Sequence, residues 1–294
     1  MIPRSTGCII LKVSEHGESD KLVTFYSQDL GRVTGIAKGA KRSKQRFVNK
    51  LEEFSRLQIF YIPPRGLTGL LLITEAELLC AHLALRREFS RYVAAMYISE
   101  LMLKFTRDND PDPRLYTLLK WALVSLEIEN DPQKIAALYH LQLLAIAGYR
   151  PELHQCSKCH RPVGPGPTFL FLPSNGSLLC SSCHPPQGGP NSNLLSVQTL
   201  KFLAKAQNTC LQQLNRLQPS RQTTDQTLLS LYYYTFHLLQ QDIHSWQVLR
   251  SLTPHPSRNI FSSRMQVRNR LYNPPPQELL TNKQHALTCP YPNT

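Results

Sequence analysis

The chain has 294 residues, of which 41% are hydrophobic, so it is long enough to form two or three domains with packed cores. Lys and Arg number 33 against 20 Asp and Glu, and the net charge of +13 favours polyanions such as nucleic acid or anionic lipid headgroups as partners. No run approaches about 18 uncharged apolar residues, so we expect a soluble protein without a membrane span.

The first 80 residues predict a small β-structure. Short, β-rich segments occupy residues 8–13, 21–27, 32–37, 57–62 and 70–74. Their number and spacing suit an OB-fold, a five-stranded barrel that commonly binds oligonucleotides across one face. We therefore predict an N-terminal five-stranded OB-fold barrel over residues 1–80.

A strongly basic segment starts in the third predicted strand and ends before the fourth. Between residues 32 and 50 there are seven cations and no acidic residue: Arg32, Lys38, Lys41, Arg42, Lys44, Arg46 and Lys50. Such a cluster lets phosphates displace condensed counterions, which is the main source of sequence-independent affinity for nucleic acid. We predict that these side chains bind nucleic-acid phosphates, whereas the plainer alternative is a solvated loop that binds nothing.

Aromatic residues near this segment offer a second mode of contact with unpaired bases, namely stacking. They are Phe25, Tyr26, Phe47, Phe54, Phe60 and Tyr61. Because apolar and polar positions alternate around them, each one taken singly is better explained as a core residue.

Helical periodicity replaces the strand pattern after residue 77. One apolar stripe predicts a single long helix and consists of Leu85, Phe89, Val93, Met96, Tyr97, Leu101 and Phe105. Asp112-Pro113 and Asp131-Pro132 each supply an N-cap followed by proline at the first helical position, and Gly148 ends the last of these helices. Residues 81–151 are predicted to be the first part of a helical domain.

Two CxxC pairs, Cys156/Cys159 and Cys180/Cys183, are separated by 20 residues. Each short turn directs its two sulfurs to a common centre, so four thiolates can surround one Zn²⁺ tetrahedrally. Because His160 and His184 follow the pairs, both also match the CxxCH pattern of c-type haem attachment, and a redox dithiol is a further alternative. No export signal is visible in the first residues, which favours structural zinc.

The predicted zinc module covers residues 152–186 and contains one apolar β-like run, residues 169–172. This is too little core to fold unaided, so metal ligation would supply folding free energy on the order of 10 kcal/mol. We expect removal of the metal to unfold the module locally. The remaining cysteines lack paired spacing and are expected to be small apolar residues or free thiols: Cys8, Cys80, Cys210 and Cys289.

The C-terminal part is helical again and ends in a basic tail. Residues 185–193 predict a flexible connection, Ser196 caps a helix that ends near residue 206, and a longer helix is expected over residues 225–252. We assign residues 187–253 to the second part of the helical domain. Residues 254–294, rich in Pro, Asn, Ser and Arg, predict a flexible tail.

Four stretches resemble the bacterial DNA repair and recombination mediator family RecO. They are GESDKLVTFYSQDLGRVTGIAKGAKR at 17–42, GLLLITEAELL at 69–79, LYHLQLLAIAGYRPELHQCSKC at 138–159 and SNGSLLCSSC at 174–183. The resemblance covers roughly residues 1–253. It implies an α+β multidomain protein with an N-terminal OB-fold, a helical domain and an inserted four-cysteine zinc module.

The resemblance also implies a function without covalent chemistry. Family members bind single- and double-stranded DNA, anneal complementary strands, and with RecR help load RecA onto DNA coated by single-stranded-DNA-binding protein. The family's basic glycine motif falls on residues 37–42, and its structural zinc ligands fall on Cys156, Cys159, Cys180 and Cys183. A cytoplasmic, nucleoid-associated location is implied, whereas the tail beyond residue 253 departs from the family pattern.

Two other classes of function compete with this one. A protein-docking scaffold stabilised by zinc could use the same cations to bind acidic partner tails. A nuclease is disfavoured because the carboxylates are dispersed, and no GxxxxGK[ST] motif supports ATP hydrolysis. Four scattered histidines are expected to be satisfied core or surface residues: His16, His82, His140 and His237.

Overall fold

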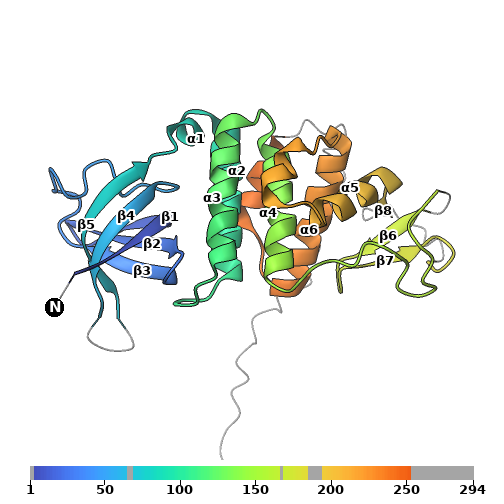
Figure 1. The fold of residues 1–294 in the computed structure, drawn as a ribbon, viewed down its shortest axis with the longest axis horizontal. Coiled ribbons are helices and arrows are strands. Elements are labelled where there is room, and N and C mark those ends of the chain that lie inside the picture. The colour runs from blue at the N-terminus through green and yellow to red at the C-terminus, as the bar shows by residue number, and fades with distance from the viewer. Residues whose placement is uncertain (1–2, 65–68, 166–167, 185–193, 253–294) are drawn as a thin grey trace, which may run out of the picture. The chain divides into compact units, whose positions relative to one another are not determined.

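The computed structural model describes residues 3–64, 69–165, 168–184 and 194–252, and Met1–Leu252 forms one compact unit (Figure 1). The connection expected at residues 185–193 and the tail expected at residues 254–294 lie outside the described residues. None of the described helices combines the length and apolar character needed to span a bilayer.

The N-terminal strands form a closed five-stranded barrel, which confirms the predicted OB-fold. Its strands are β1 (Arg4–His16), β2 (Asp20–Ser27), β3 (Gly31–Ala37), β4 (Arg56–Ile62) and β5 (Leu71–Cys80). They pair in the order β1-β2-β3-β5-β4; β3 and β5 run parallel and the other neighbours antiparallel. Buried and less buried residues alternate along β3 and β4, so one face of each strand fills the barrel.

The fifth strand is longer than predicted and continues to Cys80 instead of ending near residue 74. Its last part does not alternate, because Leu78 and Leu79 are 43% and 50% exposed. Two adjacent leucines also interrupt the alternation of apolar and polar residues in the sequence, so the sequence pattern did not predict this last part of the strand.

The predicted long helix after the barrel is two helices, α1 (Leu83–Arg87) and α2 (Phe89–Phe105). Glu88 between them has an extended backbone, and Phe89, placed on the buried stripe by the sequence pattern, is 65% exposed. Arg86 donates to the Glu53 carbonyl at 2.7 Å and to Ser55 Oγ at 2.8 Å, so α1 is bound to the barrel while α2 enters the helical core.

The next two helices begin where their caps predicted. In α3 (Pro113–Ile128) the Asp112 carboxylate accepts from the Arg114 N–H, and in α4 (Pro132–Ile146) that of Asp131 accepts from the Lys134 N–H. Both helices start at proline, which has no N–H to leave unpaired. These caps are confirmed.

The C-terminal helices are α5 (Val197–Gln207), the 3₁₀ helix η1 (Leu211–Arg216), α6 (Arg221–Leu239) and α7 (His244–Ser251). Ser196 caps α5 as predicted, but the single helix expected over residues 225–252 is wrong. The chain turns at Gln240, whose φ is +52°, and Asp242 Oδ1 then accepts from the Ile243 N–H at 2.8 Å.

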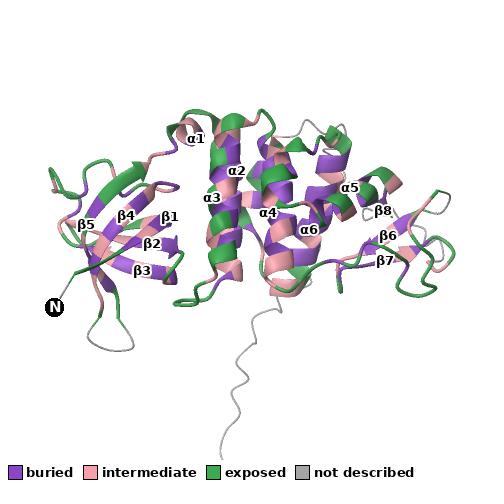
Figure 2. Cartoon of the chain, in the orientation of Figure 1, coloured by how far each residue is buried: buried purple, intermediate pink, exposed green. Residues whose placement is uncertain are grey.

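The segment with the four cysteines carries a small sheet of β6 (Phe169–Leu172), β7 (Ser177–Cys180) and β8 (Leu194–Leu195), in the order β7-β6-β8. Phe169, Phe171 and Leu178 from this sheet share one core cluster with residues of α4, α5 and α6, and these faces are buried in Figure 2. The module is therefore not limited to its own small core, because the helices supply most of the apolar surface.

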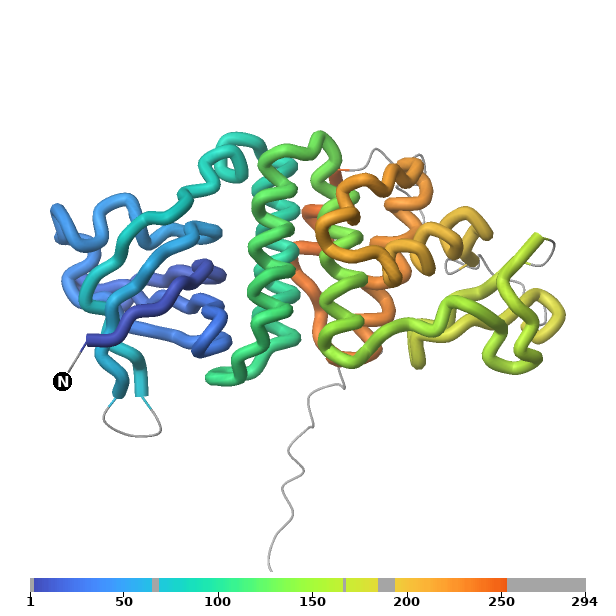
Figure 3. Tube along the Cα trace, in the orientation of Figure 1, coloured from blue at the N-terminus to red at the C-terminus, as the bar shows by residue number. Residues whose placement is uncertain are grey.

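The barrel also shares a core with the helices. Ile9, Leu11, Tyr26 and Phe54 from the barrel segment belong to the same buried cluster as residues of α2, α3 and α4. At the β2–β3 turn, a Cβ added to Gly31 would clash with the Asp110 carbonyl oxygen, so only glycine permits this close backbone approach. The chain path leaves the barrel through β5 and α1 (Figure 3).

Candidate nucleic-acid interface and metal centre

Most of the basic segment forms one long loop between β3 and β4. Three apolar side chains of this loop, Ala40, Phe47 and Leu51, are buried in the barrel core. The loop is therefore fixed to the barrel at its start, middle and end, and it presents its charged side chains on a defined backbone.

The start of the loop is held by the Asp20 carboxylate. Asp20 Oδ1 accepts from the Gly39 N–H at 2.8 Å and from the Ser19 hydroxyl at 3.0 Å. These two hydrogen bonds, followed by the nearby charge of Lys38, hold the pKa of Asp20 below its ordinary value. Gly39 has φ +67°, a left-handed conformation that glycine adopts without strain.

Two loop cations form ion pairs with carboxylates at the end of β1 and in the β1–β2 turn. Lys41 Nζ lies 2.9 Å from Glu15 Oε2, and Arg42 lies 3.7 Å from the Glu18 carboxylate. The hydrogen bond and charge of Lys41 hold the pKa of Glu15 below its ordinary value. Both carboxylates are exposed and the pairs are screened by water, so they bind the two cations weakly and another anion can replace them.

The other loop cations differ in how firmly they are held. The Arg46 guanidinium donates to the carbonyls of Thr74 at 3.3 Å and Lys38 at 3.4 Å and lies over the Phe47 ring. Lys50 donates to the Gln45 carbonyl at 3.0 Å. Lys38 and Lys44 are exposed, and neither has an ion pair among the described residues. A surface hollow of about 460 Å³ is lined by Gly39, Arg42, Ser43, Lys44, Gln45 and Arg46.

Arg32 is separated from the other six cations, since it lies near the opposite end of β3. Its Nε donates to Asp108 Oδ1 at 2.6 Å, and its guanidinium also donates to the Leu103 carbonyl. These contacts hold the barrel to the connection between α2 and α3. The sequence grouped Arg32 with the loop because the two are close along the chain, but its donors face the protein and not the loop surface.

The aromatic residues suggested for stacking are nearly all in the core. The buried ones are Phe25, Tyr26, Phe47, Phe54 and Tyr61, and only Phe60 is partly exposed. The interpretation of these five residues as core residues is therefore confirmed, and they are not available for stacking on bases. The arrangement of the loop favours contact with the charged backbone of a polyanion over contact with its bases.

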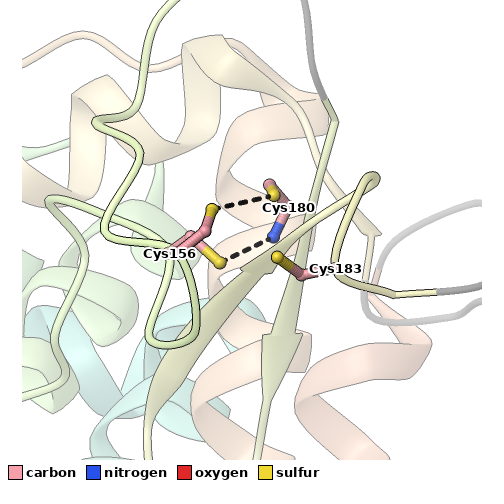
Figure 4. A group of neighbouring side chains, drawn as sticks. Cys156, Cys180 and Cys183 are labelled. Atoms are coloured by element: carbon pink, nitrogen blue, oxygen red, sulfur yellow. Dashed lines mark hydrogen bonds between the residues drawn. The ribbon is translucent and has the colours of Figure 1, made fainter.

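The structure brings the sulfurs of Cys156, Cys159, Cys180 and Cys183 within 4.8 Å of one another, and Figure 4 shows side chains of this cluster around a common point. The sulfurs of Cys159 and Cys180 are 3.6 Å apart. Tetrahedral Zn–S bonds of about 2.3 Å place sulfurs about 3.8 Å apart, so the cluster fits such an ion. These four residues could therefore bind a metal.

Backbone groups of the two CxxC turns favour thiolates. Burial alone would raise the pKa of Cys156, but N–H groups of Cys159 and Cys180 directed at its sulfur lower it to about 6. Cys183 behaves in the opposite way, because its contact with the Cys159 sulfur and its burial raise its pKa to about 12. The four sulfurs cannot all ionise beside one another unless a cation neutralises them.

Among the other cysteines, Cys8 is buried, and burial raises the pKa of its thiol well above the ordinary value. Cys210 is exposed and belongs to no cluster of ligands among the described residues. Cys80 is different, because its sulfur lies near His82 and Glu127. This group was not predicted from the sequence, since nothing in the local spacing connects residue 127 with residues 80 and 82.

Two family models match the chain and together include the barrel, the helices and the four cysteines. The model described as Recombination protein O N terminal matches residues 1–81, and the model described as Recombination protein O C terminal matches residues 86–247. The boundary between the two matches falls where β5 ends and α1 begins.

Curated proteins that carry the name DNA repair protein RecO are similar to most of the chain. The protein of Syntrophobacter fumaroxidans is 31% identical over 245 residues, which cover 83% of this chain and 96% of that protein. That of Syntrophus aciditrophicus is 28% identical over 240 residues, or 82% and 92% of the two chains. That of Anaeromyxobacter sp. (strain K) is 34% identical over 202 residues, or 68% and 77%.

Proposed function

Because this chain belongs to the RecO family of DNA repair proteins, we propose that it acts in repair as a DNA-binding recombination mediator. In this role it binds single- and double-stranded DNA, anneals complementary strands, and with RecR helps load RecA onto DNA coated by single-stranded-DNA-binding protein. No bond is made or broken in these steps, so the protein is not an enzyme. Its place of action is the bacterial nucleoid in the cytoplasm.

The observation that carries the proposal is the loop between β3 and β4. Buried apolar side chains fix this loop to the barrel. The loop carries six cations: Lys38, Lys41, Arg42, Lys44, Arg46 and Lys50. A fixed group of cations binds phosphates at a smaller entropic cost than a mobile loop would. Arg32 is left out of this interface because its guanidinium is bound to Asp108 and Leu103.

Annealing follows from the same electrostatics. Two complementary strands repel each other because each carries a phosphate at every nucleotide, and a cationic surface lowers this repulsion while base pairs form. The described aromatic residues near the loop are mostly buried, so the bases of a bound strand remain available for pairing.

The four cysteines are proposed to hold a structural Zn²⁺. A closed set of four thiolates leaves no open coordination position for water or substrate, which is typical of structural zinc and not of catalytic zinc. When bound, the ion would neutralise the thiolates and connect the two CxxC turns next to β7. We assign residues 152–186 to this module, between two parts of the helical domain at 81–151 and 187–253.

A test of the interface measures binding of single-stranded and duplex oligonucleotides at several salt concentrations. With six phosphates neutralised, log K should fall against log salt with a slope of about −4 for single strands. A variant with Lys41, Arg42, Lys44 and Arg46 changed to Ala should lose about 3 from the magnitude of that slope and should bind all sequences more weakly.

A matched control removes the same charge elsewhere. Four exposed cations of the helices are available for the change to Ala: Lys120, Lys201, Lys205 and Arg216. This control should keep most of the affinity and the slope of the wild type. An equal loss of DNA affinity in both variants would show that only net charge matters. A loop variant with the affinity and salt slope of the wild type would show that the loop is not part of the interface.

The alternative function is a docking scaffold that is stabilised by zinc and whose cations bind acidic tails of partner proteins. Both functions use the loop, but only the mediator binds naked oligonucleotides. Binding to an acidic peptide together with no binding to DNA at low salt would favour the scaffold.

A further inference from the structure

A second group of metal-ligand side chains lies where the barrel meets the helices. Cys80 ends β5, His82 precedes α1, and Glu127 is in the last turn of α3. One ligand atom from each, the Cys80 sulfur, a His82 ring nitrogen and a Glu127 carboxylate oxygen, lie within 4.8 Å of one another. None of the three belongs to the loop or to the four-cysteine cluster.

One ring nitrogen of the histidine in this group, Nδ1, is buried without a hydrogen bond. The side chain of His82 is 2% exposed, and its Nδ1 has no hydrogen-bond partner among the described residues. Nδ1 lies 2.9 Å from Glu127 Oε2, but the two atoms lack the alignment of a hydrogen bond. When a ring nitrogen and a carboxylate oxygen lie this close without a hydrogen bond, both are able to bind one metal ion between them.

The backbone holds His82 in an unusual conformation. Its φ is +45° and its ψ is +49°, in the left-handed region that residues other than glycine seldom adopt. Such conformations persist where surrounding interactions fix them, and they are common at ligand sites. His82 has this conformation immediately before α1, and its ring nitrogen lies within 4.8 Å of the ligand atoms of Cys80 and Glu127.

The electrostatics of α3 also favour a cation at this position. Glu127 lies at the C-terminal end of the helix, where the helix dipole disfavours a carboxylate. The guanidinium of Arg91 binds the carbonyls of Leu126 and Glu127, but its ion pair is with Glu88 and not with the Glu127 carboxylate. That carboxylate is 27% exposed, so an ion can reach it from solvent.

We propose that Cys80, His82 and Glu127 form a second metal site, which binds a borderline divalent transition-metal ion such as Zn²⁺. Thiolate, imidazole and carboxylate are the three ligand types of protein zinc, and three protein ligands leave one coordination position for water. The bound ion links β5 and α1 to α3. It is therefore a clamp between the barrel and the helical part, independent of the proposed role in DNA binding.

The test measures zinc per protein in the full-length chain after equilibration with Zn²⁺ and desalting. Wild type should retain two equivalents, one in each site. His82→Asn, Cys80→Ser and Glu127→Gln should each retain one, and Asn suits position 82 because it tolerates the left-handed conformation. Cys210→Ser and Glu77→Gln are matched controls, since both residues are exposed and outside the two clusters.

A spectroscopic measurement separates the two sites if a variant folds poorly. Titration of the metal-free wild type with Co²⁺ should give a second binding step whose thiolate charge-transfer band is weaker than that of the four-cysteine site. Glu127→Gln, on a partly exposed side chain, should lose that step alone. Equal zinc content in the wild type and all three variants, with one binding step for Co²⁺, would leave His82 and Glu127 as a simple ion pair and overturn the proposal.

Discussion

At the scale of single residues, His140 shows how a polar group is accommodated in the helical core. It is fully buried on α4, where Nδ1 shares a hydrogen bond with Tyr97 of α2 at 2.8 Å and Nε2 with Thr235 of α6 at 2.7 Å. Burial lowers the pKa of His140 to about 3, so the imidazole is neutral and links three helices. The expectation of a satisfied core histidine is confirmed here.

This burial predicts an acid-sensitive core. A histidine in the unfolded chain titrates near pH 6.5, whereas folded His140 stays neutral to about pH 3. Between these values the unfolded chain binds more protons, so the free energy of unfolding should fall as the pH falls below 6.5, by up to about 1.4 kcal/mol per pH unit. The stability is fully present above pH 6.5.

Urea unfolding at pH 7.5, 5.5 and 4.5 measures this effect. His140→Gln should be less stable than wild type at pH 7.5 but should lose less stability on acidification, because glutamine does not titrate. The same dependence on pH in both proteins would assign the acid sensitivity to other groups.

Arg32 and Lys44 predict opposite phenotypes, although the sequence placed both in one basic segment. Arg32→Ala removes hydrogen bonds to Asp108 and to the Leu103 carbonyl, and it should lower the free energy of unfolding by about 1 kcal/mol with little change in DNA affinity. Lys44→Ala, which removes an exposed cation of the loop, should weaken DNA binding without changing stability. Urea titrations and oligonucleotide binding of the two variants distinguish these roles. If Arg32→Ala weakens DNA binding and Lys44→Ala does not, Arg32 would be part of the DNA interface.

At the scale of elements, the sequence predicted those features that depend on local chemistry. Short, β-rich segments located the core of all five barrel strands, the Asp-Pro pairs located the starts of α3 and α4, and the cysteine spacing located four sulfurs that the structure brings together. Each of these signals lies within a few residues or in a repeated motif.

The features that the sequence did not predict depend on contacts between distant segments. Neither Glu88 nor Gln240 is a glycine or proline, so the breaks between α1 and α2 and between α6 and α7 gave no signal. The partners of Arg32 are more than 70 residues away, and Glu127 is far from Cys80 and His82 along the chain. Only the packing of helices against the barrel brings such residues together.

The cysteine module predicts a local response to metal removal. Once the ion is gone, nothing connects the two CxxC turns through their sulfurs, whereas β6 and β7 keep their apolar contacts with α4 and α6. Treatment with a chelator should therefore speed amide hydrogen exchange in residues 152–184, most at the two CxxC turns, and leave the barrel unchanged. Equal acceleration throughout the helices would show that the metal stabilises the whole C-terminal part.

At the scale of the whole molecule, shared cores join regions that differ in secondary structure. One cluster combines barrel residues with α2, α3 and α4, and another combines the small sheet with α4, α5 and α6. Helix α4 contributes to both clusters, so it connects the barrel side of the protein with the cysteine side. The barrel, the helices and the cysteine module should therefore unfold together.

A fragment of residues 1–81 tests this dependence. Removal of the helices exposes Ile9, Leu11, Tyr26 and Phe54, which should destabilise the barrel on the order of 5 kcal/mol. The fragment should melt well below the full-length chain in circular dichroism at matched concentration and salt. A fragment as stable as the intact protein would show that the barrel is an independent domain.

The strand β3 joins the part of the barrel that contacts the helices to the part that carries the cationic loop. It begins at Gly31 and Arg32, which contact the α2–α3 connection, and it ends where the cationic loop starts, about 20 Å away at about 3.3 Å per residue. Pairing with β2 covers the whole of β3, and β5 pairs with its last three residues, Gly35 to Ala37. A change in position of the loop would therefore displace β3 as one element, because β3 is the segment of chain that joins the loop to the residues in contact with the helices.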